Sequence, residues 1–221
     1  MENPWKRFGT KPPFVIPEDE AAICAFNARS RPASTLHLEI LPEPFLGRPD
    51  ANIILLNLNP GFSHEEIRYH HLDSYFASVA RKNLLHEEQD FPFYFLDPGY
   101  HSPGHVWWQK RLGALLELYG PRRIANEVLC VEFFPYHSEH FGYDGPRLHS
   151  QDYSFYLVRR AIQRNSAIII MRSKWFWLAA VPELASSNYF ELNSPQAVYV
   201  SQGNAGAGFA AIRERLERRQ N

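Results

Sequence analysis

Four short apolar runs do most to limit what this chain can fold into. None of them alternates apolar with polar residues, a pattern typical of strands that are buried on both faces of a parallel sheet. Helical patterns separate the runs, so successive strands are joined by crossover helices. The runs are Ile53–Leu56, Val128–Phe134, Ala167–Met171 and Tyr189–Leu192. We therefore predict an α/β protein, a three-layer α/β/α sandwich on a small, mostly parallel four-stranded sheet.

Helices are predicted where apolar residues recur at spacings of three and four. The predicted helices are Glu18–Arg29, His105–Tyr119, Tyr153–Arg164, Ser173–Ala180 and Ala207–Arg218. Gly120-Pro121 and Val181-Pro182 provide stop signals for two of them. Trp107-Trp108 and Trp175-Phe176-Trp177 lie at helical spacing, so we interpret these aromatic residues as core.

The chain is long enough, at 221 residues, to bury one large core, and no boundary is evident inside it. Residues 1–50 contain eight of the 17 prolines, which predicts an irregular N-terminal arm packed on a core formed by residues 51–221. We expect a single domain over residues 1–221. The formal net charge of −1 provides no general attraction for a polyanion, so nucleic acid must bind through a local basic patch.

Several classes of site lack the residues that they need. Only Cys24 and Cys130 are present, which excludes a disulfide scaffold and a four-cysteine metal site and fits a reducing cytoplasm. The Gly-x-Ser-x-Gly elbow and the phosphate-loop motif do not occur. No apolar run approaches membrane-spanning length and the first residues lack a signal-peptide core, so we expect a cytoplasmic protein without a membrane partner.

Histidines occur in three small groups, none of which has the spacing of a metal site. The groups are His70-His71 with Asp73, His101 with His105, and His137 with His140. We interpret them as solvated loop residues, and we expect no metal and no other cofactor.

Polar segments follow three of the predicted strands where these strands end. Asn57-Leu58-Asn59-Pro60-Gly61 leaves the first strand, and Glu132 lies near the end of the second. Asn193-Ser194-Pro195 leaves the fourth strand, and the glycine-rich stretch 202–208 leads into the last helix, where its backbone N–H groups could hold a phosphate. Because parallel strands end at one edge of a sheet, where open α/β folds bind ligands, we expect these segments to face one cleft.

Two of these residues also have a structural interpretation. Asn59 stands before a proline, which is a common way to form a turn. A carboxylate such as Glu132 at the end of a buried strand is costly, so it either binds a ligand or pairs with an arginine or lysine. The residues alone leave both interpretations open.

The order of these segments resembles the uracil-DNA glycosylase superfamily, in particular its mismatch-specific and single-strand-selective-like branch, of which this chain would be a divergent member. Asn57-Leu58-Asn59-Pro60-Gly61 is similar to the first motif of that family. Leu192-Asn193-Ser194-Pro195, followed by the glycine-rich stretch and Phe209, is similar to the second motif and its helix. Ile168–Met171 and the turn after it resemble the third strand. The N-terminal arm lies outside the resemblance.

The resemblance implies a role for each matched residue. Asn59 would position the water that attacks the N-glycosidic bond, and Asn193 would stabilise the charge that develops on the leaving base. Gly61 would leave room for a large base, and Phe62 would stack on the extruded nucleotide. The implied base pocket consists of Gly61, Phe62, Glu132 and Phe134, and the implied phosphate and DNA contacts are Ser194, Pro195, Gly203, Asn204 and Gly206.

The function implied by the resemblance is hydrolysis of the N-glycosidic bond of a damaged or mismatched base in DNA, without a cofactor and by a monomer. Glu132 lies about where the family reads the uracil edge. A carboxylate only accepts hydrogen bonds, so it favours an edge with adjacent donors, as in guanine, and a substrate other than uracil. The proline expected between Asn193 and Ser194 is missing. Two alternatives stay open: a non-catalytic nucleic-acid or nucleotide-binding member of the same fold, and a hydrolase of a small nucleoside-like metabolite.

Overall fold

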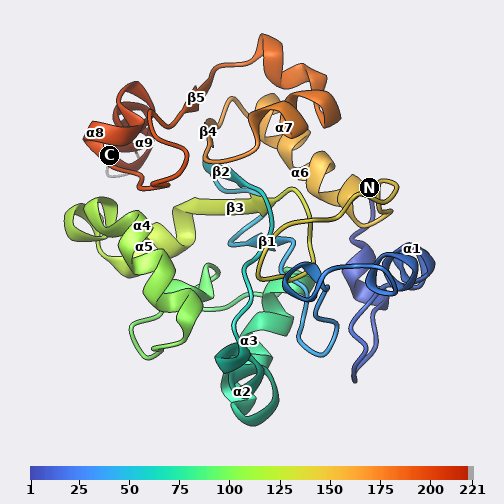
Figure 1. Cartoon of the computed structure of the whole chain (residues 1–221). Coiled ribbons are helices and arrows are strands. Elements are labelled where there is room, and N and C mark those ends of the chain that lie inside the picture. The colour runs from blue at the N-terminus through green and yellow to red at the C-terminus, as the bar shows by residue number, and fades with distance from the viewer. Residues whose placement is uncertain (219–221) are drawn as a thin grey trace.

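A five-stranded sheet in the order β1-β3-β2-β4-β5 forms the centre of the protein (Figure 1). The computed structural model describes residues 1–218. The strands are β1 (Phe45–Leu46), β2 (Ile53–Asn57), β3 (Val128–Glu132), β4 (Ala167–Ile170) and β5 (Tyr189–Glu191). β2 pairs in parallel with β3 and β4, and β4 with β5, whereas β1 is antiparallel to β3. The prediction of a mostly parallel α/β sheet is confirmed.

The predicted number of four strands is one too few. Phe45 and Leu46 pair with Val131 and Cys130 and add a short antiparallel strand to the edge of the sheet. This strand lies in the proline-rich segment and has only two residues, so it leaves no periodicity in the sequence.

Helices occupy the connections between the strands. The α-helices are α1 (Pro17–Asn27), α2 (His64–Leu72), α3 (Ser74–Leu85), α4 (Pro103–Tyr119), α5 (Pro121–Glu127), α6 (Gln151–Gln163), α7 (Lys174–Ala180), α8 (Gln202–Ala205) and α9 (Ala207–Arg218). Short 3-10 helices are η1 (Pro4–Arg7), η2 (Pro32–Ser34), η3 (Tyr94–Leu96) and η4 (Pro182–Ser186). The five predicted helices are confirmed within a few residues, and α2, α3, α5 and α8 were not predicted. None of the helices within residues 1–218 is long and apolar enough to cross a bilayer.

The helices cover both faces of the sheet. In Figure 1, α6 and α7 lie on one side of the strands, and α4, α5 and α9 lie on the other. Side-chain hydrogen bonds join the helices of the second group. Arg123 of α5 donates to the carbonyl oxygen of Leu216 in α9, and the Tyr119 hydroxyl of α4 donates to Glu217 at 3.0 Å. All residues of β2, β3 and β4 are buried, which explains why these strands are apolar without alternation.

The aromatic residues of α7 are only partly core. Trp177 is buried, but Trp175 is 76% exposed and Phe176 is 47% exposed. A helix on the outer layer of a sandwich packs one side against the sheet and leaves the other in solvent, so a run of three aromatic residues cannot be buried throughout.

Residues 1–50 contribute to the core as well as covering it. Trp5, Ile16 and Phe45 are buried in the same hydrophobic cluster as β2 and β3. Just before β1, the backbone N–H of Glu43 donates to the carbonyl oxygen of Pro135 at 2.9 Å. The N-terminal segment therefore follows β3 to its carboxyl end, where the candidate site lies.

Gly47 permits the turn that follows β1. Its φ is +110°, and a Cβ at this position would lie 2.2 Å from the carbonyl oxygen of Val128. The N–H of Gly47 donates to Asn83 Oδ1 at 3.0 Å, and Asn83 Nδ2 donates to the carbonyl oxygen of Phe45 at 2.7 Å. The buried Asn83 side chain thus holds both ends of this turn.

We expect Gly47→Ala to lower the free energy of unfolding by about 2 kcal/mol or more, because alanine is strained at positive φ and its methyl group overlaps a backbone oxygen. Gly113→Ala is the matched control, since a Cβ there meets nothing within 4 Å. This helix-interior change should raise stability by about 0.5–1 kcal/mol. Urea unfolding followed by circular dichroism measures both, and an unchanged midpoint for Gly47→Ala contradicts the prediction.

Candidate functional site

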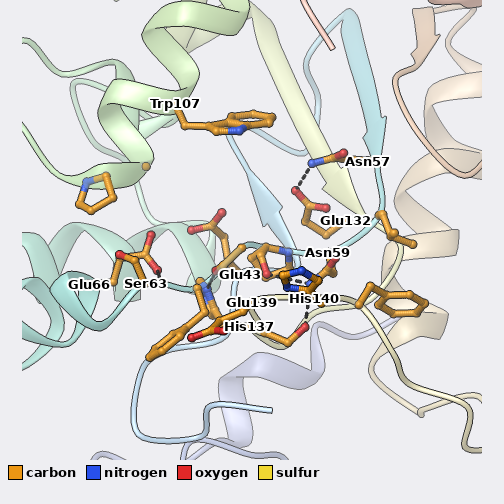
Figure 2. Close-up of a pocket in the computed structure, with 18 of the residues that line it drawn as sticks. Glu43, Asn57, Asn59, Ser63, Glu66, Trp107, Glu132, His137, Glu139 and His140 are labelled. Atoms are coloured by element: carbon orange, nitrogen blue, oxygen red, sulfur yellow. Dashed lines mark hydrogen bonds between the residues drawn. The ribbon is translucent and has the colours of Figure 1, made fainter. Parts of the chain in front are cut away.

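A cavity of about 520 Å³ opens at the carboxyl ends of β2 and β3 (Figure 2). Its volume lies in the range typical of small-molecule sites. Asn57 and Glu132 contribute from the strands, and Trp107 of α4 lies across the cavity from Asn59. Of the residues predicted from the sequence, those that line the cavity are Asn59, Gly61, Phe62 and Glu132.

The last residues of β2 and β3 form a buried polar pair. The parallel register pairs Asn57 with Glu132, which places both side chains on the same face of the sheet. Asn57 Nδ2 donates to Glu132 Oε1 at 3.0 Å. Asn57 Oδ1 and Glu132 Oε2 are buried and have no hydrogen-bond partner within residues 1–218. Buried polar atoms are normally satisfied, so these two oxygens indicate a ligand or water in the cavity.

Glu132 does not have the structural partner that the sequence left open. Among the described residues, no arginine or lysine forms an ion pair with it, and its hydrogen bonds come from Asn57 and from the Cys130 thiol at 3.8 Å. The Arg172 charge acts on it only from a longer range. The buried carboxyl group is therefore left facing the cavity.

Three carboxyl groups of the cavity have raised pKa values. Burial raises the pKa of Glu132 to about 8 and that of Glu66 to about 7. Burial, together with the charges of Glu132 and Glu66, raises the pKa of Glu43 well above its usual value. At neutral pH Glu132 is therefore mostly protonated and can donate a hydrogen bond. Glu132 was predicted to act as an acceptor only, and its burial changes that expectation.

Asn59 lies in the loop after β2 and has one amide atom available. Its Nδ2 donates to Ser138 Oγ at 3.1 Å and to the carbonyl oxygen of Pro60 at 2.9 Å. No hydrogen bond to its Oδ1 occurs among the residues that the structure describes. Figure 2 shows Asn59 next to His140 at the cavity wall. The fixed nitrogen leaves the oxygen as a hydrogen-bond acceptor.

His137 holds the loop that carries Asn59. Its Nδ1 lies 2.7 Å from the carbonyl oxygen of Gly61, and its Nε2 lies 3.1 Å from that of Leu41. Burial lowers the pKa of His137 to about 4. The interpretation as a solvated residue is wrong for His137 and also for His105, since both are buried. In the described part of the chain, no group of potential ligands is arranged to hold a metal ion.

Two aromatic residues of the cavity differ in how far their ring faces are occupied. The Phe62 ring stacks on His37, with 3.3 Å between ring centres and 5° between planes, so one of its faces is occupied. Trp107 extends from α4 over the cavity (Figure 2). Trp107 is only partly buried and packs against the core while it lines the cavity, so its interpretation as core holds in part, whereas Trp108 is buried as predicted. Trp107 is an aromatic cavity residue that sequence reasoning did not select.

Phe134, predicted to line a base pocket, belongs to the core. It is buried, and its ring centre lies 4.6 Å from that of Tyr143 and 5.6 Å from that of Phe141. It is absent from the described residues that line the cavity. This aromatic cluster draws the side chain away from the strand end.

The second predicted segment closes on itself. Asn193 Nδ2 donates to the carbonyl oxygen of Gly203 at 3.0 Å, and the Asn193 N–H donates to that of Asn204 at 2.8 Å. Asn204 Oδ1 accepts from the Ser194 N–H at 2.8 Å, and its Nδ2 donates to the carbonyl oxygen of Tyr199 at 3.0 Å. The described residues lining the cavity do not include Asn193, Ser194, Pro195, Gly203, Asn204 or Gly206. The structure therefore does not bring Asn193 together with Asn59 and Glu132.

Two glycines of this segment serve the backbone. Gly206 has a φ of 49° in the turn between α8 and α9. A Cβ on Gly208 would lie 2.8 Å from Phe190 Cβ and 2.9 Å from Ile169 Cδ1, because α9 packs closely on β4 and β5. The backbone therefore accounts for Gly206 and Gly208 without a bound phosphate, whereas a Cβ on Gly203 would meet nothing within 4 Å.

The cavity also contains residues that sequence reasoning did not select. They include Glu43, Asn57, Glu66, Trp107, Ser138 and Arg172. Asn57 had a usable signal, because it ends an apolar strand as Glu132 does. Glu43 and Glu66 come from segments that carry no strand signal, and only the folded chain brings them here.

The raised carboxyl pKa values predict a pH-dependent stability. Between pH 5 and 8 the folded protein keeps a proton on Glu132 that the unfolded chain has lost, so stability falls as pH rises, by about 1.4 kcal/mol per pH unit for each such group. Glu132→Gln removes this contribution. We expect the melting temperature of the variant to depend less on pH between 5 and 8. Relative to the parent protein, the melting temperature of the variant should rise toward pH 8. Equal slopes in the two proteins, with matching circular dichroism at pH 5, contradict the prediction.

Comparison of the whole chain with protein-family models, with curated proteins and with solved structures finds no match.

Proposed function

We propose that this chain is a uracil-DNA glycosylase-like protein that hydrolyses the N-glycosidic bond of a damaged or mismatched base in DNA. The observation that supports this most is the pair of unpartnered oxygens on Asn57 and Glu132, in a cavity that Asn59 also lines. Asn57 and Asn59 both belong to the segment that resembles the first family motif. A base that has been extruded from DNA is read in such a pocket through hydrogen bonds at its edge.

The polar pair sets the base edge that the cavity accepts. Protonated Glu132 offers a donor beside Asn57 Oδ1, an acceptor, and this complements an N–H beside a C=O, as in uracil, hypoxanthine or xanthine. Ionised Glu132 offers two acceptors, which suit the adjacent donors of guanine. The raised pKa of Glu132 favours the first arrangement at neutral pH. Uracil is therefore within the proposed substrate range.

Asn59 would orient the attacking water. Its Nδ2 is held by Ser138, so its Oδ1 can accept a hydrogen bond from a water molecule placed against the sugar. The water oxygen bonds to C1′ as the N-glycosidic bond breaks, the bonding pair leaves with the base, and the water proton ends on the base. Glu132 in its protonated form can stabilise the charge that develops on the departing base. The resemblance had assigned that part to Asn193.

A protein that binds a base without cleaving it is the second candidate. The observation that favours it is the placement of Asn193, whose amide is bound to Gly203. The small net charge agrees with a protein that does not depend on a long DNA-binding surface. A hydrolase of a small nucleoside-like metabolite would use the same cavity and needs no DNA.

Asn59→Ala separates catalysis from binding. We expect the rate of base release to fall roughly 100-fold or more, because water orientation is lost. Affinity for the same oligonucleotide should change less than threefold. Single-turnover assays on oligonucleotides containing uracil, hypoxanthine, xanthine or alkylated bases measure release, and fluorescence anisotropy measures binding.

Asn52→Ala at the amino end of β2 is the matched control and should keep the parent rate. Release by the parent protein from none of these oligonucleotides rules out the proposed activity. If the parent protein still binds these oligonucleotides without releasing a base, the result favours the non-catalytic candidate. Equal rates for the parent and Asn59→Ala remove Asn59 from the mechanism.

A further inference from the structure

Arg172 places an unpaired positive charge at the cavity. It follows β4, which ends at Ile170, and it lines the cavity wall. Within residues 1–218 its guanidinium forms neither a hydrogen bond nor an ion pair. Burial lowers the pKa of Arg172, while the Glu132 charge raises it and the Arg111 charge lowers it. Glu132 is the acidic group that acts on the pKa of Arg172. It is mostly protonated at neutral pH, so it does not neutralise the Arg172 charge.

Arg111 is a second guanidinium that forms no ion pair within the described residues. It is held between two aromatic rings, 4.8 Å from the centre of Trp107 and 4.7 Å from that of Tyr199. Its Nε is buried and has no acceptor among the described residues. The carbonyl oxygen of Arg111 accepts from the Val200 N–H at 2.9 Å, which fixes the Tyr199 loop against α4. Stacking orients the guanidinium and leaves its N–H groups for an external acceptor.

A groove beside the cavity contains Arg111. It shares Pro103 and Trp107 with the cavity, so the two hollows meet at the Trp107 side chain. Its charged and titratable lining residues are Glu65, His101, Lys110, Arg111 and Tyr199. Some arginines form an ion pair with a carboxylate, as in Arg48–Asp50 and Arg122–Asp90. Within residues 1–218, Arg111 and Arg172 form none, and they differ from other unpaired arginines in lining two hollows that meet at Trp107.

The Arg111 charge repels that of Arg172, and an anion that binds between or beside the two groups relieves this repulsion. The guanidinium fork suits the oxygens of a phosphate group. A nucleotide carries its phosphate one sugar away from the base, so a base in the cavity places a phosphate near the cavity rim. We propose that Arg172 and Arg111 form an anion subsite that binds the phosphate of the nucleotide whose base occupies the cavity. This inference rests on the proposed function, because it takes the cavity as the base site.

Calorimetry on the full chain tests the subsite. The probes are deoxyuridine, deoxyinosine and deoxyguanosine, their 5′-monophosphates, and inorganic phosphate as competitor. We expect a monophosphate to bind at least tenfold tighter than its nucleoside, and Arg172→Gln or Arg111→Gln to remove most of that gain, because a charge-assisted hydrogen bond is lost. The affinity for deoxyuridine and deoxyinosine should stay within twofold. Raising the salt concentration should weaken the binding of the monophosphates and leave that of the nucleosides unchanged.

Arg122→Gln is the matched control, since its partner Asp90 lies away from the cavity residues. Arg172→Lys, which keeps the charge, should retain part of the gain and guards against a folding defect in Arg172→Gln. A trinucleotide with one central deoxyuridine separates the sources of phosphate. If the trinucleotide binds more tightly than deoxyuridine and the two arginines are needed for this, the subsite binds a backbone phosphodiester. If only the monophosphate binds more tightly, the subsite binds a terminal phosphate.

The results distinguish failure of the subsite from failure of the proposed function. Equal affinity for nucleosides and monophosphates, or a gain that survives both glutamine variants, overturns the subsite and leaves the base cavity standing. Binding of inorganic phosphate that depends on Arg172 and Arg111, without binding of any nucleoside or nucleotide base, supports the anion subsite and counts against the base-binding function.

Discussion

The hydrogen bond from Asn57 to Glu132 joins the ends of the two central strands, and the carboxyl edge of the sheet is built around it. The strand register brings the two side chains together. The backbone oxygen of Asn57 is itself fixed, because Trp177 Nε1 donates to it at 2.8 Å. A buried carboxyl group contributes little to stability by itself, and one that keeps an unpartnered oxygen costs free energy. Its presence here is best explained by recognition of a ligand, since a well-packed apolar residue would stabilise the same strand end more.

The same edge depends on the N-terminal segment. Glu43 reaches the cavity because its backbone and that of Pro44 pair with the end of β3, where the Glu132 N–H donates to the Pro44 oxygen at 2.9 Å. Tyr94 donates to Glu43 Oε2 at 3.0 Å and satisfies one of its oxygens. Glu43, Glu66 and Glu132 thus come from three separate segments. Carboxyl groups so placed cannot all be ionised at once, so the cavity holds protons that it can exchange when a ligand binds.

Much of the sheet could be predicted from the sequence, because strands buried on both faces leave continuous apolar runs. β1 could not, since two residues in a proline-rich segment carry no period. α2 has no buried residue, so it presents no apolar stripe to detect. In the site, Asn59 and Glu132 were predicted because polar residues at the end of a buried strand are visible in the sequence. The placement of Asn193 depends on how Asn204 closes its loop, and that of Trp107 depends on the rotation of α4, and neither is encoded in a local pattern.

The two proposed subsites are coupled through charge. The Arg172 charge lowers the pKa of Glu132 against the larger effect of burial. A phosphate on Arg172 neutralises that charge, so the pKa of Glu132 rises further and its protonated form is favoured. The protonated form is the one that pairs with an N–H beside a C=O. In a nucleotide with such a base edge, binding of the phosphate therefore strengthens binding of the base, and binding of the base strengthens binding of the phosphate. A base with two adjacent donors needs ionised Glu132, and its phosphate opposes that ionisation. This coupling favours uracil-like and hypoxanthine-like nucleotides over guanine.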